Sequence, residues 1–160
     1  MIVDELIYNR TATDVEELAR LAEAIKAGTA TSAQAQQYLN GVNKGAYGVS
    51  DLVRVENAVV YIRDRLQEFG YRVDLEIVGK WSKEYLPTQD DFRRYFNNIA
   101  IIRATLEEHK NSPPVPSSDI SLFGYAEANA VEKILVDMED LLNRIAAAWF
   151  YSNDIYSGEV

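Results

Sequence analysis

The chain has 160 residues, of which 48% are apolar and 11% aromatic, which is enough to bury a core in one folded domain and argues against disorder. Its 16 basic and 25 acidic residues give a formal charge of -9, which argues against nucleic acid and anionic membrane surfaces as direct partners, because both are negatively charged. The absence of cysteine excludes a disulfide framework, a thiolate nucleophile and a cysteine-based zinc site.

The N-terminal segment, residues 1–48, predicts one or two short helices followed by a connector. Thr13 and Glu16 have the spacing of a capping box and open a first helix, which Gly28 ends. A second short helix is expected to begin at Thr31 or Ser32. Three glycines between this helix and residue 50 then indicate a flexible or tightly turned connection.

A recurring pattern predicts three longer helices, at 50–69, 88–108 and 125–151. In each of them an Asn is followed by apolar residues at the same offsets. The matched residues are Asn57, Ala58, Val59, Ile62 and Leu66, then Asn97, Asn98, Ile99, Ile102 and Leu106, then Asn129, Ala130, Val131, Ile134 and Met138. Matched apolar positions on three helices predict a mainly α fold, in which the whole chain 1–160 forms one domain around a helical bundle.

On a helical wheel, each matched Asn lies nearly opposite the shared apolar positions. One interpretation is that each Asn lies on the polar side of an amphipathic helix. The other is that its amide binds the backbone of a neighbouring loop or sets the register of an oligomer. Glu132 and Lys133 near this face predict that Asn129 is the most exposed of the three. The interface candidates on these faces are Asn57, Tyr61, Asn97 and Ile101.

Between the first two long helices, residues 71–78 alternate apolar and charged side chains, which is the period of a half-buried β-strand or hairpin. A lone strand cannot satisfy its own backbone, so this one needs a partner from residues 2–8, from residues 155–160 or from another subunit. The loop at 79–87 follows and is apolar enough to be pinned to a surface. The interface candidates in this region are Tyr71, Val73, Leu75 and Trp81.

The C-terminal end concentrates aromatic and apolar residues, which a free tail in water would not favour. We expect residues 152–160 to form a docking tail. The tail packs against its own chain, exchanges between subunits or anchors a neighbouring protein. The interface candidates here are Trp149, Phe150, Tyr151, Ile155 and Tyr156.

Residues able to carry out chemistry are sparse. His109 is the only histidine and lies near a predicted helix end among charged residues, where an exposed side chain is expected. The carboxylates of Asp90, Asp91 and the cluster Asp137, Glu139 and Asp140 are expected on solvated helix faces. The glycine-containing connector lacks a phosphate-binding pattern. We therefore expect no catalytic residues, no metal ligands and no cofactor, and a protein that is not an enzyme.

The sequence also lacks targeting and membrane signals. The N-terminus has neither the basic region nor the uninterrupted apolar stretch of a signal peptide, and no later segment approaches the roughly 20 apolar residues of a membrane span. We expect a protein made in the cytosol, without membrane insertion.

Several strings in the sequence carry a resemblance to a known family. They are IYNRT at 7–11, GAY at 45–47, DLVRVENAV at 51–59, ANAVEKIL at 128–135, and AWFYS at 148–152 with YSGE at 156–159. Over nearly its whole length the chain resembles a family of small proteins encoded in prophages of Gram-positive (Firmicute) bacteria, whose genes typically lie among the tail, baseplate and fibre genes. Asn153 stands where many relatives have Gly, which alters the turn of the tail.

The resemblance implies a non-enzymatic structural component of a phage or phage-tail-like particle, in the tail tip, baseplate or fibre of the virion. Such a subunit acts by oligomerisation, with a trimer favoured because tail fibres usually are trimers, and by docking to neighbouring tail proteins. The alternative is an acidic adaptor or inhibitor that binds a basic protein surface, with its acidic residues concentrated on one exposed face. An enzyme, the third option, requires a cleft where two carboxylates and an aromatic platform converge.

Overall fold

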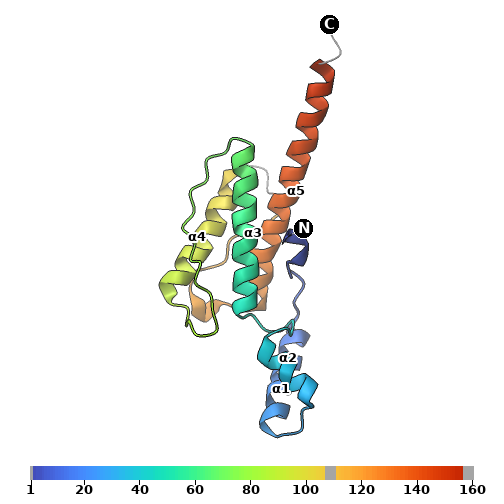
Figure 1. The fold of residues 1–160 in the computed structure, drawn as a ribbon, viewed down its shortest axis with the longest axis vertical. Coiled ribbons are helices and arrows are strands. Elements are labelled where there is room, and N and C mark those ends of the chain that lie inside the picture. Colours follow the sequence, from blue (N-terminus) through green and yellow to red (C-terminus); the bar gives the residue numbers. More distant parts are fainter. Residues whose placement is uncertain (1, 107–110, 157–160) are drawn as a thin grey trace.

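The computed structural model describes residues 2–106 and 111–156, with side chains described as far as Trp149. The elements are, in order, the 3-10 helix η1 (Ile2–Glu5), α1 (Ala12–Lys26), α2 (Ser32–Asn40), α3 (Val49–Glu68), α4 (Gln89–Thr105), the 3-10 helix η2 (Ile120–Leu122) and α5 (Tyr125–Tyr156). Figure 1 shows α3, α4 and α5 as the body, with the α1–α2 hairpin at one end and the distal part of α5 projecting at the other. The predicted mainly α, helical-bundle fold is confirmed.

The core lies between α3, α4 and α5 and is built from the matched apolar positions. In each helix, the three residues that follow the Asn at offsets of two, five and nine are almost completely buried. These residues are Val59, Ile62, Leu66, Ile99, Ile102, Leu106, Val131, Ile134 and Met138. Each helix therefore presents one apolar stripe to the same interior, as the recurrence predicted.

The helix ends follow from capping chemistry. Thr31 with Gln34 and Thr88 with Asp91 form capping boxes, and Thr31 is one of the two residues expected to start the second helix. Gly70 has the left-handed φ of 85° that permits the turn after α3. The predicted cap of α1 at Thr13 is wrong, because Thr11 and Asp14 form the capping box instead. This earlier pair has the same spacing and lets the helix begin one residue before Thr13.

The C-terminal prediction is also corrected. The long helix α5 continues to Tyr156 and does not end at residue 151, so residues 152–156 extend the helix and do not form a separate docking tail. Residues 157–160 lie outside the described part of the chain, as do residues 107–110 with His109.

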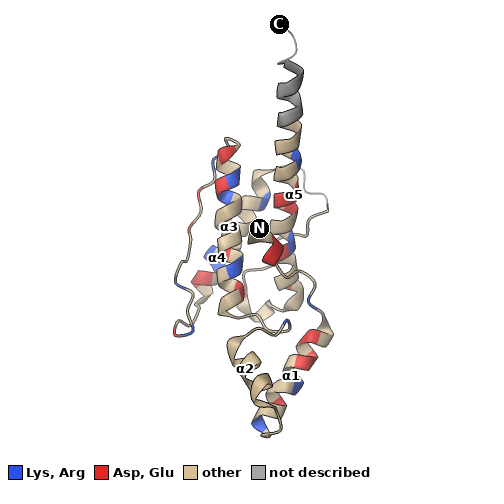
Figure 2. Cartoon of the chain, turned by 45° about the vertical axis from the view of Figure 1, so that its right-hand side comes forward, with Lys and Arg blue, Asp and Glu red and all other residues tan. Residues whose placement is uncertain are grey.

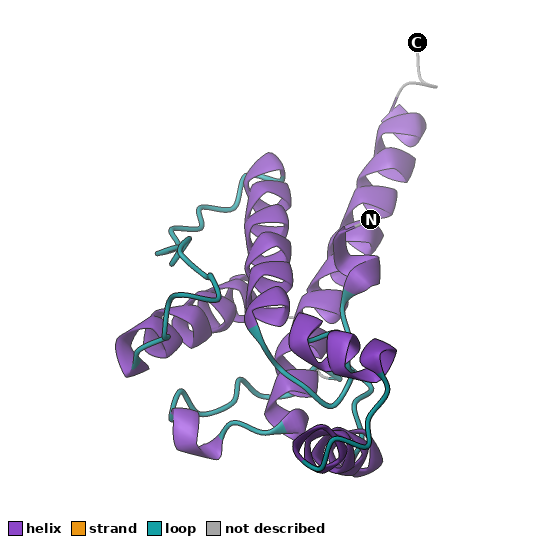
Figure 3. Cartoon of the chain, turned by 60° about the horizontal axis from the view of Figure 1, so that its bottom comes forward, coloured by secondary structure: helices purple, strands orange, loops and turns teal. Residues whose placement is uncertain are grey.

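Residues 71–78 do not form the predicted strand or hairpin; they run as an extended loop beside α3 and α4 (Figure 3). The alternation itself is present, because Val73 is buried and Leu75 and Ile77 pack against the core. What differs is the backbone pairing. Side chains of α3 and α4 take the place of a partner strand, and residues 2–5, one of the expected partners, form η1 instead.

The α1–α2 hairpin packs mainly on itself, and none of its helical residues is buried. The connector that follows lies close to α1 at Gly45, where an added Cβ would lie 2.1 Å from the carbonyl oxygen of Asp14. Only glycine permits this approach. No helix in the described part of the chain is both long and apolar enough to cross a membrane.

Candidate interaction surfaces

The matched Asn residues occupy two different environments. The amide of Asn129 donates to the carbonyl oxygen of Arg10 at 2.8 Å and accepts from its N–H at 2.9 Å. Asn129 thus holds the segment before α1 against α5, although the sequence predicted it to be the most exposed of the three. Asn57 and Asn97 are exposed on the surface of the single chain, and a role for them in an oligomer stays a prediction.

A second backbone-binding amide lies one residue after Asn97. The side chain of Asn98 is buried, donates to the carbonyl oxygen of Glu76 at 2.8 Å and accepts from its N–H at 3.0 Å. Two residues further along the same loop, the carboxylate of Glu56 accepts from the N–H groups of Val78 at 2.9 Å and Gly79 at 3.1 Å. These bonds satisfy the backbone groups of Glu76, Val78 and Gly79 within the chain.

Four charged side chains meet where the N-terminal segment crosses α3 and α5. The guanidinium of Arg10 lies 2.9 Å from Asp51 and 2.8 Å from Glu132, and that of Arg54 lies 2.6 Å and 3.0 Å from the same two carboxylates. Arg10, Asp51 and Glu132 are buried. Glu132 also accepts from the N–H of Ile7 at 2.6 Å. We call these four residues the charge cluster; two positive and two negative groups balance in it.

Two tyrosines close the charge cluster from the side of α4. The hydroxyls of Tyr47 and Tyr95 lie 2.6 Å apart, and the guanidinium of Arg10 lies over the ring of Tyr47, 5.2 Å from its centroid. Burial raises the pKa of both tyrosines well above the usual value, so they are neutral hydrogen-bonding groups at physiological pH. Burial lowers the pKa of Arg54, but its bonds to Glu132 and Asp51 outweigh this and leave it raised.

Two carboxylates expected on solvated faces are in fact buried. Asp91 is completely buried and accepts from the hydroxyl of Tyr85 and from the N–H and hydroxyl of Thr88. Glu139 is 3% exposed and accepts from Arg65 at 2.6 Å and from the hydroxyl of Tyr61 at 3.1 Å. Both carboxylates therefore accept hydrogen bonds that join parts of the same chain.

The structure packs several of the predicted interface candidates against its own core. Val73 is buried, while Leu75, Ile101 and Trp81 are half-buried against the core. The indole of Trp81 also packs edge-on against Phe92 and Tyr95. Tyr71, at 37% exposure, stays at the surface.

The distal part of α5 presents the clearest exposed candidate. Trp149 is 56% exposed, and its ring packs edge-on against Phe69, with 5.4 Å between centroids. Phe69 is the residue that caps α3, so Trp149 lies over the end of that helix. The other candidates of this region, Phe150, Tyr151, Ile155 and Tyr156, lie on the backbone of α5, but their side chains fall outside the described residues.

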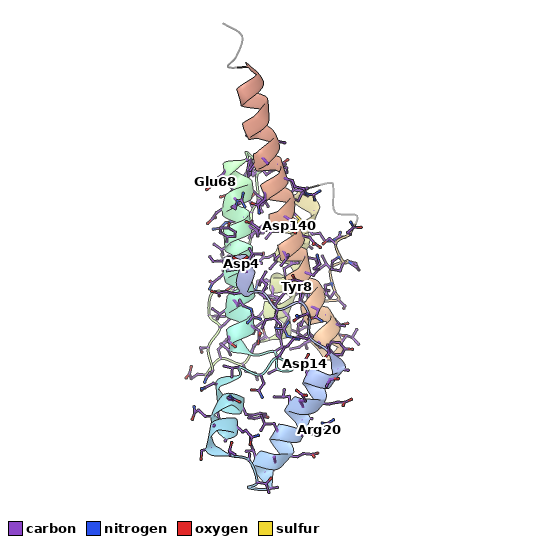
Figure 4. The ribbon with its side chains drawn as sticks, turned by 90° about the vertical axis from the view of Figure 1, so that its right-hand side faces the viewer. Asp4, Tyr8, Asp14, Arg20, Glu68 and Asp140 are labelled. Carbon is purple, nitrogen blue, oxygen red and sulfur yellow. The ribbon has the colours of Figure 1, made fainter. Side chains whose placement is uncertain are left out.

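A cleft of about 250 Å³ lies between η1 and α5. It is lined by the carboxylates of Asp4, Glu139 and Asp140, with Tyr8 beside them (Figure 4). Glu139 is already held by Arg65 and Tyr61, as described above. Within the described ranges, no three His, Asp or Glu side chains are grouped to hold a metal ion.

The sequence contains a signal for some of the buried charged residues that the sequence analysis did not single out. Asp51 and Arg54 stand before Asn57 at the same distances as Asp91 and Arg94 stand before Asn97. In both helices the Asp is buried and accepts a hydrogen bond from the Arg three residues later, at 2.6 Å. The repeated Asp-x-x-Arg spacing is thus a local signal for two ion pairs whose carboxylates are buried. Glu132 and Glu56, by contrast, carry no local signal.

Comparisons of the chain with protein-family models, with curated proteins and with solved structures give no significant match.

Proposed function

We propose that the chain is a non-enzymatic structural subunit of a phage or phage-tail-like particle, located in the tail tip, baseplate or fibre of the virion. It acts by forming a homo-oligomer and by docking to neighbouring tail proteins. The kind of particle follows from the resemblance of its sequence to prophage proteins of the tail, baseplate and fibre region. The mode of action rests on the shape of the molecule.

The observation that carries the mode of action is the projection of α5. This helix continues beyond the end of α3, and Trp149 on the projecting part is 56% exposed. An exposed aromatic side chain on a protruding helix is typical of an assembly contact. Several buried polar side chains, by contrast, hold a loop or the N-terminal segment in place, among them Glu56, Asn98 and Glu132, which suits a rigid building block.

The distribution of charge favours a structural subunit over an acidic adaptor. Exposed acidic residues lie on α1, α3, α4 and α5, with basic residues among them (Figure 2). Five of the acids are buried and bind groups of the same chain, namely Asp51, Glu56, Asp91, Glu132 and Glu139. An inhibitor of a basic surface would need its acids on one exposed face.

The test is to purify particles by density gradient from the bacterium that encodes the chain, after prophage induction, and to identify their proteins by mass spectrometry. We expect the chain in the fraction that contains tails, in constant ratio to other tail proteins. Deletion of its gene should give particles with incomplete tail ends in electron micrographs. Particles of normal composition that lack the chain would contradict the proposed function.

A further inference from the structure

The apolar stripe of α5 does not stop where the bundle stops. Leu135, Met138 and Leu142 are completely buried, and Ile145 and Trp149 follow at the same alternating spacing of three and four residues. Exposure rises along the stripe, because Ile145 is half-buried and Trp149 is 56% exposed. A stripe that repeats every seven residues is the pattern by which helices pair side by side.

The stripe faces the side of α5 on which α3 lies. Arg65, near the end of α3, donates to Asn143 at 2.8 Å, and Phe69 meets Trp149 edge-on. Beyond this level α5 continues alone to Tyr156 (Figure 1). At about 1.5 Å per residue, the part from Ile145 onward extends roughly 15 Å past α3. We call residues 145–156 the overhang.

This geometry determines how a second copy can pair with the overhang. In a parallel pair along the stripe, the second copy would place its own bundle in the volume that α3 already fills. In an antiparallel pair, each overhang lies above the partner's α3 and the two bundles lie at opposite ends. An antiparallel pair is also isologous, so the same surface is covered on both copies.

The charge pattern favours the same arrangement. The overhang has one charged residue, Asp154, in a chain whose net charge is -9. Two copies can therefore approach along the overhang with little repulsion. An antiparallel arrangement then keeps the two acidic bundles apart, whereas parallel dimers or trimers would bring them side by side.

From these relationships we infer that two copies of the chain pair through antiparallel overhangs into a two-fold symmetric dimer, with Trp149 near the centre of the contact. This inference rests on the proposed function for its purpose, since it names the contact through which the subunit assembles. It replaces the trimer that the resemblance suggests with a dimer.

The first test is the mass of the full-length chain in solution, measured by light scattering. We expect twice the chain mass of 18.1 kDa for the wild type, and the chain mass itself for Trp149→Glu. Leu86→Glu is the matched control, because it adds the same charge at an apolar side chain that is 86% exposed and lies in the loop before α4. It should remain a dimer. A wild-type monomer or trimer, or a dimer that persists in Trp149→Glu, would overturn the inference.

The second test measures the relative orientation of the two copies. Because the sequence has no cysteine, an introduced cysteine is the only site that a thiol-reactive label can modify. A spin label on Ser50→Cys, at the exposed start of α3, reports the distance between the far ends of the two bundles. The antiparallel dimer separates the two labels by roughly 60 Å or more, from the rise along α3 and the overhangs. A short distance would show side-by-side bundles and contradict the inference.

Two further observations keep the interpretation unambiguous. The far-ultraviolet circular dichroism of Trp149→Glu should match that of the wild type, so that loss of the dimer is not loss of the fold. A chain that is monomeric in solution but present in purified particles would refute the pairing and leave the proposed function in place. A chain that is a dimer in solution but absent from purified particles would support the pairing and refute the proposed function.

Discussion

The side-chain amide of Asn129 and the backbone of Arg10, 119 residues apart in sequence, exchange two hydrogen bonds. Through this contact α5 holds the N-terminal segment in place. From this position the side chain of Arg10 binds Asp51 and Glu132 in the charge cluster. One of the three matched Asn residues thus has a structural role that its two counterparts do not share.

Asn129→Ala should lower the free energy of unfolding by about 1–3 kcal/mol, because it leaves a half-buried N–H and carbonyl without their partner. Chemical denaturation measures the loss. Asn57→Ala and Asn97→Ala are matched controls at the equivalent, exposed positions and should change stability by no more than about 0.5 kcal/mol. Equal effects at all three positions would refute the assigned role.

Glu56→Gln tests whether a carboxylate replaces a partner strand. The substitution removes the charge and one of the two acceptor oxygens that bind the N–H groups of Val78 and Gly79, so we expect a loss of about 1–3 kcal/mol. Amide hydrogen exchange at these two residues should also accelerate. Glu68→Gln, at an exposed position on the same helix, should leave exchange unchanged. If both variants exchange alike, the loop is held by its apolar side chains alone.

Glu132→Gln tests the charge cluster. It keeps the size of the side chain but leaves Arg10 and Arg54 with one carboxylate between them, and removing one partner of a buried ion pair costs about 3–5 kcal/mol. Thermal and urea unfolding should both show the loss. Asp140→Asn, exposed on the same helix, is the control and should be nearly neutral. A neutral result for Glu132→Gln would mean that the cluster contributes nothing to stability.

Asp91 should make stability depend on acid pH. Burial raises the pKa of its carboxyl, but the hydrogen bonds from Tyr85 and Thr88 and the charge of Lys80 outweigh this and hold the pKa well below 3.8. The unfolded chain has an ordinary Asp pKa of about 3.9 and therefore binds more protons at acid pH. The contribution of Asp91 to stability is thus complete above about pH 5 and is lost as the pH falls further.

The measurement is the free energy of unfolding from about pH 6 to about pH 3, a range chosen to span the unfolded pKa. The stability advantage of the wild type over Asp91→Asn should shrink as the pH falls. Asp90→Asn, at the exposed neighbouring residue, should follow the wild-type pH profile. A constant difference between wild type and Asp91→Asn across the range would contradict the lowered pKa.

The bundle could be predicted from the sequence because its signal is periodic. The apolar residues at matched offsets in the three long helices are the core, and the capping residues Thr31 and Thr88 set two of the helix starts. Such signals act within one or two turns of a helix. The alternation at 71–78 also reported burial correctly through Val73.

What could not be predicted depends on contacts between distant segments. Alternation cannot show whether a backbone is paired by a strand or by the side chains of Glu56 and Asn98, because both arrangements bury the same residues. Glu132 resembles a surface acid until Arg10, 122 positions earlier in the printed sequence, is placed beside it. The expectation that Trp149 marks an interaction surface, and the tail-protein role itself, stay predictions.

The incorporation of variants into particles tests the account most directly. Particles induced from the encoding bacterium are compared when its gene carries the wild-type sequence, Leu86→Glu or Trp149→Glu, and the amount of chain sedimenting with tails is measured by quantitative mass spectrometry. We predict that the wild type and Leu86→Glu sediment with tails, while Trp149→Glu remains in the supernatant. Recovery of all three chains only in the supernatant would contradict the claim that this protein is a structural part of the particle.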